Sequence, residues 1–346
     1  MKVCKFVEGS FVPSLDGASE KFSQVSRKFA DQGIDLTIVH CYRGWSDLTK
    51  IADQTFTTYA ISPRYYYHQH SIVDKVVQEI RPDIIEMNDA ELVISTGLHL
   101  NQKFRVPLVF DNQFVPSVML KDLNLDPLAI EEEKKKEKAL GKAISGAVCF
   151  TNLDKDHFVD STGVDPDRVA IIPLGSDYES IKIRDLKESD KTVLFLGNMY
   201  FEPNSEAVEY AAEQIVPDVI SKNPEIRFKF VGDVPSSIKS KYESKNINFI
   251  GRINDINQVF EGIRVCIAPI KTGGGMRVKI LTYMSTGIPI VTTSIGAEGI
   301  SDPSVFKIAN DPKQFAESIN DLFMDLPGSV QLGRRARELV ISSHSW

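Results

Sequence analysis

Short apolar runs alternate along this chain with longer amphipathic stretches. The runs are rich in β-branched residues and apolar nearly throughout, which is typical of strands buried on both faces. The predicted strands have the sequences KVCKFV, DLTIVHC, DIIEM, PLVFD, GAVCFT, TVLFLG, FKFVG, INFIG, VCIAPI and IPIVTT. The segments between them that favour helix include residues 19–32, 72–80, 131–144, 205–221 and 276–285. The repeated order of strand and helix predicts an α/β fold with parallel sheets and helices on both faces.

The alternating pattern starts again after a polar stretch, IKIRDLKESDK, which is typical of a linker. The chain has 346 residues, which suits two α/β domains of about 150 residues each. We therefore expect two doubly wound, Rossmann-like domains, residues 1–185 and 186–346. Ligands of such sheets bind at the carboxyl ends of the strands, so two domains that face each other predict a central cleft.

Composition narrows the class of protein. The formal net charge is −7, from 47 acidic and 40 basic residues, whereas a general nucleic-acid binder carries a basic excess. We therefore expect no nucleic-acid partner. The four cysteines lie in or beside apolar runs, which indicates reduced thiols in a reducing compartment. The start of the chain lacks a signal-peptide pattern, and no apolar run reaches about 18 residues. These features predict a cytoplasmic protein and leave open a peripheral contact with a membrane surface.

A glycine-rich stretch in the second half carries most of the chemistry. Residues 271–300 read KTGGGMRVKILTYMSTGIPIVTTSIGAEGI and follow a predicted strand. Gly273, Gly274 and Gly275 allow a tight turn and a close approach of the backbone to a ligand. A helix is expected to begin near Met276 or Arg277 and to end at Gly287, and its first amides are unpaired at the positive end of the helix dipole.

Arg277 and Lys279 add cationic side chains at that helix start. Helix start, glycines and cations together predict a cradle for a diphosphate. A purely structural turn is the alternative interpretation.

Polar residues also follow predicted strands in the first half. Glu86 belongs to a group predicted just past the strand in DIIEM, and Asp111 and Asn112 are predicted just past the strand in PLVFD. Carboxyl ends of parallel strands meet at one sheet edge, so we expect these side chains in the cleft as candidate catalytic residues. Gly17 follows the first strand, where it would let a loop approach the phosphates of one substrate or a second substrate; a simple turn is the alternative.

No metal site is predicted. His68 and His70 alternate in YYYHQH and could pair on one face, but no cysteine or placed carboxylate accompanies them. No DxD triplet follows a strand, so we expect neither a metal-bound diphosphate nor another cofactor.

The glycine-rich stretch resembles the C-terminal signature of retaining glycosyltransferase family four, the glycosyl transferases group 1. Other stretches that resemble this family are PLGSD, FLGNMYFEPNSEAV, FVGD and FIGRINDI, so the resemblance covers nearly the whole chain and is strongest in the second half. It implies the GT-B fold, with an N-terminal acceptor-side domain and a C-terminal nucleotide-sugar-binding domain.

The resemblance also implies an activity. The expected enzyme is a hexosyltransferase-like glycosyltransferase that moves a sugar from a nucleoside-diphosphate sugar to an acceptor hydroxyl. The acceptor would be a glycan, a lipid-linked saccharide or another hydroxyl compound, as in polysaccharide or glycoconjugate biosynthesis. Transfer would retain the anomeric configuration and need no metal.

The donor-binding positions that the resemblance implies lie in the helix start, the glycine loop and three other loops. They are Gly17, Asn198, Arg252, Ile253, Gly273, Gly274, Gly275, Met276, Arg277, Val278, Lys279 and Thr282.

Two departures from the family pattern keep other functions open. Gly274 and Thr282 stand where many members have two glutamates, and Asn198 and the residues near Asn204 stand where many have an arginine and a lysine. The alternatives are a non-catalytic GT-B protein that binds a nucleotide or a partner subunit, and a nucleotide-sugar epimerase. The final residues, ISSHSW, also lead us to expect that the family's last crossing helix is short or absent.

Overall fold

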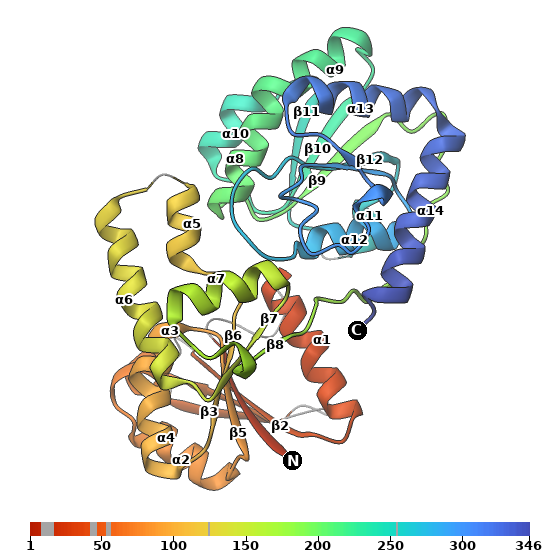
Figure 1. Cartoon of the computed structure of the whole chain (residues 1–346). Helices are drawn as coiled ribbons and strands as arrows, with labels where there is room; N and C mark the ends of the chain where they lie inside the picture. Colours follow the sequence, from red (N-terminus) through yellow and green to blue (C-terminus); the bar gives the residue numbers. More distant parts are fainter. Residues whose placement is uncertain (8–16, 42–46, 53–56, 124, 254) are drawn as a thin grey trace. The chain divides into compact units, whose positions relative to one another are not determined.

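The computed structural model describes residues 1–7, 17–41, 47–52, 57–123, 125–253 and 255–346. The chain divides into two compact units, Met1–Pro173 (unit 1) and Leu174–Trp346 (unit 2). Each unit contains its own largely parallel sheet with helices packed against it (Figure 1). The predicted α/β class with two doubly wound domains is confirmed, and the cleft between the domains stays a prediction.

The two units separate after Pro173 rather than at the predicted residue 185. The backbone amide of Ser176 donates to the carbonyl oxygen of His344 at 2.7 Å, and that of Arg184 donates to Thr286 at 2.8 Å. Both partners belong to unit 2. The predicted linker is polar because one side of it is exposed, but its backbone hydrogen bonds attach it to unit 2.

The sheet of unit 1 has the strand order β3-β4-β2-β1-β5-β6-β7-β8, in which only β3 runs antiparallel to its neighbour. Three of these strands, β3, β4 and β8, are absent from the predicted set. The threonines of β4 and the shortness of β8 give them no apolar run. The strands are β1 (Lys2–Val7), β2 (Asp35–Cys41), β3 (Leu48–Ala52), β4 (Thr57–Ile61), β5 (Ile84–Met87), β6 (Leu108–Asp111), β7 (Gly146–Cys149) and β8 (Val169–Ile171).

Helices cover both faces of this sheet. On one face Phe22 of α1 packs with Val3 and Val7 of β1. On the other face Cys4 and Phe6 pack in the larger core with α2 and α4, because side chains alternate along a strand. The helices of unit 1 are α1 (Gly17–Asp31), η1 (Arg64–His68), α2 (Ser71–Ile80), α3 (Ala90–Leu92), η2 (Val93–Gly97), α4 (Leu98–Phe104), α5 (Pro116–Asp122), α6 (Pro127–Ala143), α7 (Asn152–Thr162) and η3 (Pro166–Arg168).

The sheet of unit 2 is parallel throughout, with the strand order β11-β10-β9-β12-β13-β14. Every residue of β12 is buried, as expected of a central strand covered on both faces. The strands are β9 (Thr192–Leu196), β10 (Arg227–Val231), β11 (Ile247–Gly251), β12 (Ile263–Ala268), β13 (Ile290–Thr292) and β14 (Lys307–Ile308).

The helices of unit 2 confirm the predicted segments with one interruption. The segment predicted as a helix over 205–221 has a π-helical turn in its middle, just before Pro217, which lacks an amide hydrogen for a regular helical bond. The helices are α8 (Glu202–Tyr210), η4 (Ala211–Ile215), α9 (Val216–Lys222), α10 (Ser236–Tyr242), α11 (Ile256–Val259), α12 (Val278–Thr286), η5 (Pro303–Val305), α13 (Pro312–Met324) and α14 (Leu326–Ser343).

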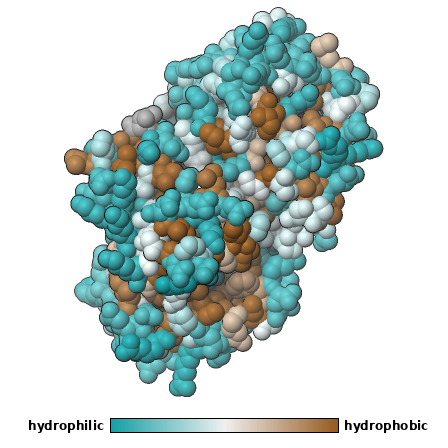
Figure 2. Space-filling model, in the orientation of Figure 1, coloured by the Kyte–Doolittle hydropathy of each residue, from teal (hydrophilic) through white to brown (hydrophobic). Residues whose placement is uncertain are grey.

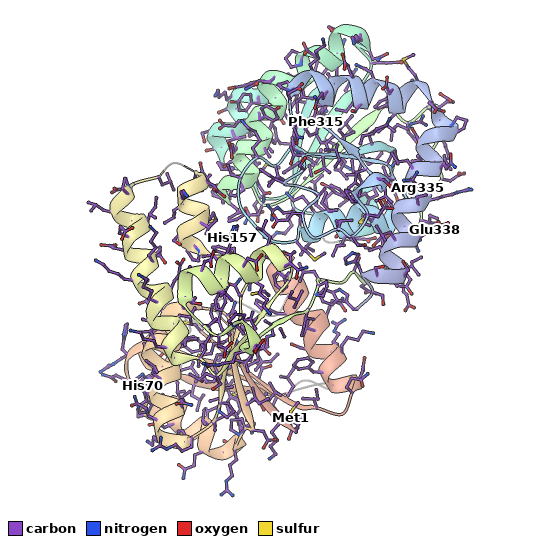
Figure 3. All side chains as sticks on the ribbon, viewed as in Figure 1. Met1, His70, His157, Phe315, Arg335 and Glu338 are labelled. Carbon is purple, nitrogen blue, oxygen red and sulfur yellow. The ribbon has the colours of Figure 1, made fainter. Side chains whose placement is uncertain are left out.

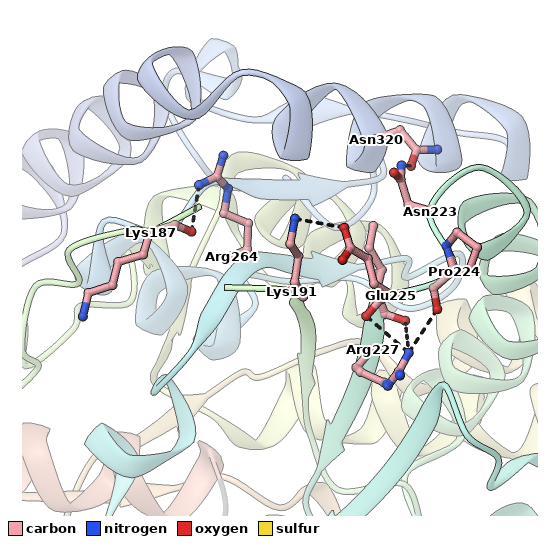
Figure 4. A network of polar contacts seen from close by, with 9 residues as sticks. Lys187, Lys191, Asn223, Pro224, Glu225, Arg227, Arg264 and Asn320 are labelled. Atoms are coloured by element: carbon pink, nitrogen blue, oxygen red, sulfur yellow. Dashed lines mark hydrogen bonds and ion pairs between the residues drawn. The ribbon is translucent and has the colours of Figure 1, made fainter. Parts of the chain in front are cut away.

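A buried arginine joins three segments of unit 2 (Figure 4). Arg264 of β12 is 1% exposed and donates to the carbonyl oxygen of Leu322 at 3.0 and 3.3 Å and to that of Lys187 at 3.3 Å. Burial lowers the pKa of its guanidinium. Leu322 lies in the last turn of α13, where the helix dipole favours a cation. Arg264 therefore fastens the segment after Pro173 to the core of unit 2.

Helix α14 packs closely against α12. A Cβ atom on Gly333 would lie 1.8 Å from the carbonyl oxygen of Gly287, so only glycine allows this approach. Figure 3 shows Phe315 of α13 directed into unit 2, and Arg335 and Glu338 on the outer side of α14. On the face shown in Figure 2, the outer helices of this unit are mostly hydrophilic. This packing against α14 holds α12 in place, together with the glycine-rich loop at its start.

Candidate functional site

The glycine-rich loop connects β12 to α12, as predicted. Gly273 and Gly275 have φ angles of 83° and 84°, a region that favours glycine. Helix α12 begins at Val278 with Arg277 as its N-cap, and it ends at Gly287, whose φ is 74°. The predicted helix start near Met276 or Arg277 is thus correct to within two residues. Its first amide hydrogens are available at the carboxyl edge of the sheet.

Arg277 holds the loop that precedes it. Its Nη1 donates to the carbonyl oxygens of Gly274 and Gly275, and its Nη2 donates to that of Gly273. A guanidinium can do this because it presents several donors in a fixed plane. The side chain therefore shapes the loop and also places a positive charge at it.

Lys279 lies in the first turn of the same helix and is partly buried. Its Nζ is 2.5 Å from Oδ1 of Asn204 on α8 and 4.1 Å from the centroid of the Phe195 ring on β9. Burial, together with the nearby positive charge of Arg277, lowers the pKa of Lys279 to about 7. Among the described residues it forms no ion pair.

The loop after β9 lies beside this lysine. The Nδ2 of Asn204 donates to the carbonyl oxygen of Asn198 at 2.8 Å, and the Oδ1 of Asn198 accepts from the amide of Tyr200 at 3.0 Å. Asn198 thus shapes the turn, and Asn204 connects that turn to Lys279. From the sequence, the residues near Asn204 stood out only because many family members have a lysine there.

The other predicted donor residues of unit 2 divide into two groups. Arg252 forms an ion pair with Asp233 at 2.5 Å, and Ile253 is partly exposed beside it, on the loop after β11. Met276, in contrast, is 6% exposed, and its Sδ accepts from the amide of Leu174 at 3.4 Å. The side chain of Met276 is therefore directed into unit 2 and anchors the loop there.

Thr282 lies one turn after Val278, and both are partly exposed. The hydroxyl of Thr282 donates to the carbonyl oxygen of Val278 at 3.0 Å. This bond within the helix occupies the hydroxyl proton, so the side chain offers a ligand only acceptor capacity.

In unit 1 the predicted acidic candidates meet a lysine that sequence reasoning missed. Lys5 of β1 lies opposite Glu86 of β5 in the sheet. Its Nζ bonds Oε1 of Glu86 and lies 4.0 Å from Oδ2 of Asp111. Burial opposes the charge of Lys5, which is 2% exposed, but the two carboxylates outweigh it and raise its pKa. The one indication in the sequence is a charged residue at an inward position between Val3 and Val7.

Three of the predicted positions in unit 1 need correction or closer definition. Glu86 lies within β5 rather than past its end. Asn112 is 1% exposed, and its Nδ2 lies 3.7 Å from Sγ of Cys149, so its side chain points into the core and not into a cleft. Gly17 is the first residue of α1, and residues 8–16 before it lie outside the described part of the chain.

The two alternating histidines of YYYHQH, His68 and His70, do not stack on each other. The ring of His70 (Figure 3) stacks on that of His99 with centroids 4.2 Å apart, rather than pairing with His68. His99 in turn bonds Asp74 at 2.8 Å. Within the described ranges, no group of three or more histidine, cysteine, aspartate or glutamate side chains is arranged to hold a metal ion.

Residues 190–325 match the sequence model of the family described as glycosyl transferases group 1. This segment includes the loop after β9, the glycine-rich loop and α12. The match covers less than half of the chain and lies within unit 2. The resemblance to this family seen in the sequence is confirmed for these residues.

Solved structures show that the likeness in fold extends over both units. Sucrose-phosphate synthase from Thermosynechococcus elongatus superposes with a TM-score of 0.78 at 14% identity, over 100% of this chain and 96% of that one. HepE from Anabaena, in complex with UDP-glucose, superposes with a TM-score of 0.72 at 16% identity, over 100% and 96%. The predicted GT-B fold class is confirmed.

Sequence relatives match a shorter part. The Escherichia coli UDP-Gal:alpha-D-GlcNAc-diphosphoundecaprenol alpha-1,3-galactosyltransferase is 25% identical over 204 residues, which are 52% of this chain and 49% of that protein. The chain spans less than half the length of the curated relatives that it matches.

Across the described ranges of the chain, none of the helices combines the length and the apolar character needed to cross a bilayer.

Proposed function

We propose that this chain is a glycosyltransferase that moves a sugar from a UDP-sugar to a hydroxyl of a lipid-linked saccharide. The observation that carries the proposal is the glycine-rich loop before α12, with Arg277 bound to its carbonyl oxygens and Lys279 in the first helical turn. Backbone amides at a helix start together with two cations suit a diphosphate. The UDP-glucose complex of HepE supports the donor, and the printed name of the E. coli relative supports both donor and acceptor.

In the proposed reaction the bond between the anomeric carbon and the diphosphate oxygen breaks, and a bond from the anomeric carbon to the acceptor oxygen forms. The leaving diphosphate gains negative charge in the transition state. The amides at the start of α12, Arg277 and Lys279 stabilise that charge, which lowers the barrier because they gain most when the charge is largest. We propose that these cations take the part of a metal ion, and that the anomeric configuration is retained.

We assign the acceptor to unit 1. Glu86 and Asp111 lie beside each other at the carboxyl edge of its sheet, on either side of the buried Lys5 ammonium. Carboxylates accept hydrogen bonds from sugar hydroxyls, and the ammonium of Lys5 holds the pair in place. A lipid-linked acceptor would also bring the protein to a membrane surface from its cytoplasmic side.

The proposal is tested by supplying radiolabelled UDP-galactose, UDP-glucose or UDP-N-acetylglucosamine with GlcNAc-diphosphoundecaprenol and separating the lipid products. We expect label in the lipid fraction with one donor, and its loss in Arg277→Ala. Labelled lipid from the variant at the wild-type rate would remove the glycine-rich loop from the mechanism.

A second function, nucleotide binding without transfer, is favoured by one observation. The hydroxyl of Thr282 bonds Val278 where many group 1 members have a glutamate, so a donor contact is reduced. Binding of UDP without transfer to any supplied acceptor, and without hydrolysis of any supplied donor, would support this alternative. The epimerase alternative, which would use Glu86, Asp89 and Asp111, gains no support, since Lys5 neighbours Glu86 and Asp111 and Asp89 caps α3.

A further inference from the structure

Lys279 is a partly buried lysine whose surroundings do not supply a negative charge. Its amine is bounded by the Phe195 ring at 4.1 Å and by the neutral amide oxygen of Asn204 at 2.5 Å. The charged group that acts on it is the guanidinium of Arg277, which has the same sign. The ring face and the amide oxygen each stabilise an ammonium, but burial and the like charge of Arg277 disfavour the ammonium more strongly.

Neighbouring elements keep their carboxylates occupied elsewhere. On α8, Glu206 accepts a hydrogen bond from the hydroxyl of Thr272 at 2.7 Å. On the loop after β10, Asp233 pairs with Arg252. Lys271, the cation at the start of the glycine-rich loop, lies over the Tyr210 ring at 4.7 Å. Phe195 on β9 and Gly197 just after it carry no charge. Among the described residues, no carboxylate forms an ion pair with Lys279, so we look to a ligand for the anion that completes its surroundings.

Two residues fix where the amine lies. The Nδ2 of Asn204 donates to the carbonyl oxygen of Asn198 at 2.8 Å, which leaves its Oδ1 turned to Lys279. Gly197 leaves the necessary space, because a Cβ atom there would lie 2.8 Å from the Nζ of Lys279 and 3.0 Å from the Nδ2 of Asn204. The amine is thus held over the end of β9, beside the start of α12.

We propose that Asn204 and Gly197 are positioning residues that hold the Lys279 amine at the end of β9, that this amine is neutral in the free protein, and that a nucleoside diphosphate, on binding, is accompanied by one proton from solvent that converts the amine to the ammonium. This inference rests on the proposed function, since it requires a diphosphate at the glycine-rich loop. The proton adds to the lone pair of Nζ, no other bond changes, and the positive charge then faces the diphosphate. The pKa of Lys279, lowered by burial and by Arg277 to about 7, agrees with this order of events.

The test is calorimetric titration with UDP at pH 8 in two buffers of different ionisation enthalpy. At this pH the terminal phosphate of UDP is already ionised, because its second pKa is about 6. We expect the wild type to take up at least about half a proton per UDP bound, since a lysine with a pKa near 7 is mostly neutral at pH 8. Its affinity should also fall from pH 7 to pH 9.

Variants separate positioning from simple structural support. Lys279→Arg carries a permanent charge and should bind UDP with no proton uptake and a flat pH profile. Asn204→Asp should also abolish uptake. A carboxylate beside Nζ raises the pKa of the lysine, so the amine is already protonated before the ligand arrives. Gly197→Ala should weaken binding by displacing the amine. Lys271→Met, a lysine removed from the same loop, should leave the uptake unchanged.

UDP binding by the wild type without proton uptake, or equal uptake by Lys279→Arg, would overturn the inference and leave the proposed function standing. A wild type that binds none of UDP, GDP, ADP and TDP would overturn the proposed function, and the inference with it.

Discussion

Arg277 shapes the glycine-rich loop, because its guanidinium bonds the carbonyl oxygens of Gly273, Gly274 and Gly275. The same side chain places a positive charge beside any ligand of that loop. Lys5 serves two carboxylates inside unit 1 in a similar way. Lys279 differs from both, since its nearest partner is a neutral amide. The consequences for function can be tested one residue at a time.

Arg277→Ala is expected to weaken UDP binding by about tenfold to a hundredfold. Losing a charge-assisted hydrogen bond costs about 1.5–3 kcal/mol. Calorimetric dissociation constants measure the effect. Arg277→Lys is the matched control. A lysine keeps the charge but lacks the planar set of donors that bonds three carbonyl oxygens at once, so we expect an intermediate loss of UDP affinity. An alanine variant with wild-type affinity would show that Arg277 only shapes the loop.

Thr282→Glu is expected to raise the affinity for a nucleotide-sugar, because a carboxylate can accept hydrogen bonds from both ribose hydroxyls. The gain is about 1.5–3 kcal/mol if the geometry of the family applies. Thr282→Val removes the hydroxyl that bonds Val278 and should leave binding unchanged. Weaker binding by the glutamate variant would mean that the donor lies differently here.

At the scale of elements, α12 is defined by glycines at both ends and by α14 beneath it. Gly275 precedes its first turn, and Gly287 ends it with a φ of 74°. Gly333 of α14 lies so close to Gly287 that its side chain can be no more than a hydrogen atom. The packing of these two helices therefore supports the glycine-rich loop from a distance.

Gly333→Ala is expected to destabilise the protein by about 1–3 kcal/mol, because the added methyl group meets the backbone of Gly287 rather than a flexible side chain. A melting curve measures this, at about 2–4 °C for each kcal/mol. Arg334→Ala, at the exposed neighbouring position on α14, is the control and should leave the melting temperature unchanged. Equal melting temperatures for all three proteins would contradict the close contact.

The elements also show how far periodicity reaches. It predicts β1, β2, β9 and β12 from their apolar runs, but the antiparallel β3 and β4 carry threonines and leave no such run. Strand β3 lies at the edge of the sheet, and its first three residues are exposed. Strand β4 beside it is largely buried, so its threonines and not its exposure hide it from the apolar pattern. The π-helical turn before Pro217 likewise interrupts a segment whose pattern predicts one helix.

At the scale of the whole molecule, two units with separate sheets divide the proposed tasks, the donor in unit 2 and the acceptor in unit 1. The group 1 match lies wholly in unit 2. In the proposed function, the positive charges of Arg277 and Lys279 at one loop take the place of a divalent cation on the donor side.

Transfer activity is therefore expected to survive EDTA. The measurement is the initial rate of labelled product formation in about 5 mM EDTA, compared with the rate in added manganese or magnesium. A metal-dependent transferase loses its Lewis acid when EDTA chelates the metal. A matched assay of Lys279→Met should show loss of rate in both conditions. Activity that EDTA abolishes and manganese restores would refute the expectation.

The sequence by itself determined the features that depend on local backbone preference. The glycines at 273–275 and at 287 set the two ends of α12, and the apolar runs set most strands, because periodicity and backbone freedom are properties of neighbouring residues. Only the tertiary structure decided which side chains meet. Lys279 bonds Asn204, which is 75 positions away in the sequence, and Lys5 bonds Glu86, which is 81 positions away. Strand order and register bring such pairs together, and these follow from burying both faces of each sheet at once, which no short stretch of sequence encodes.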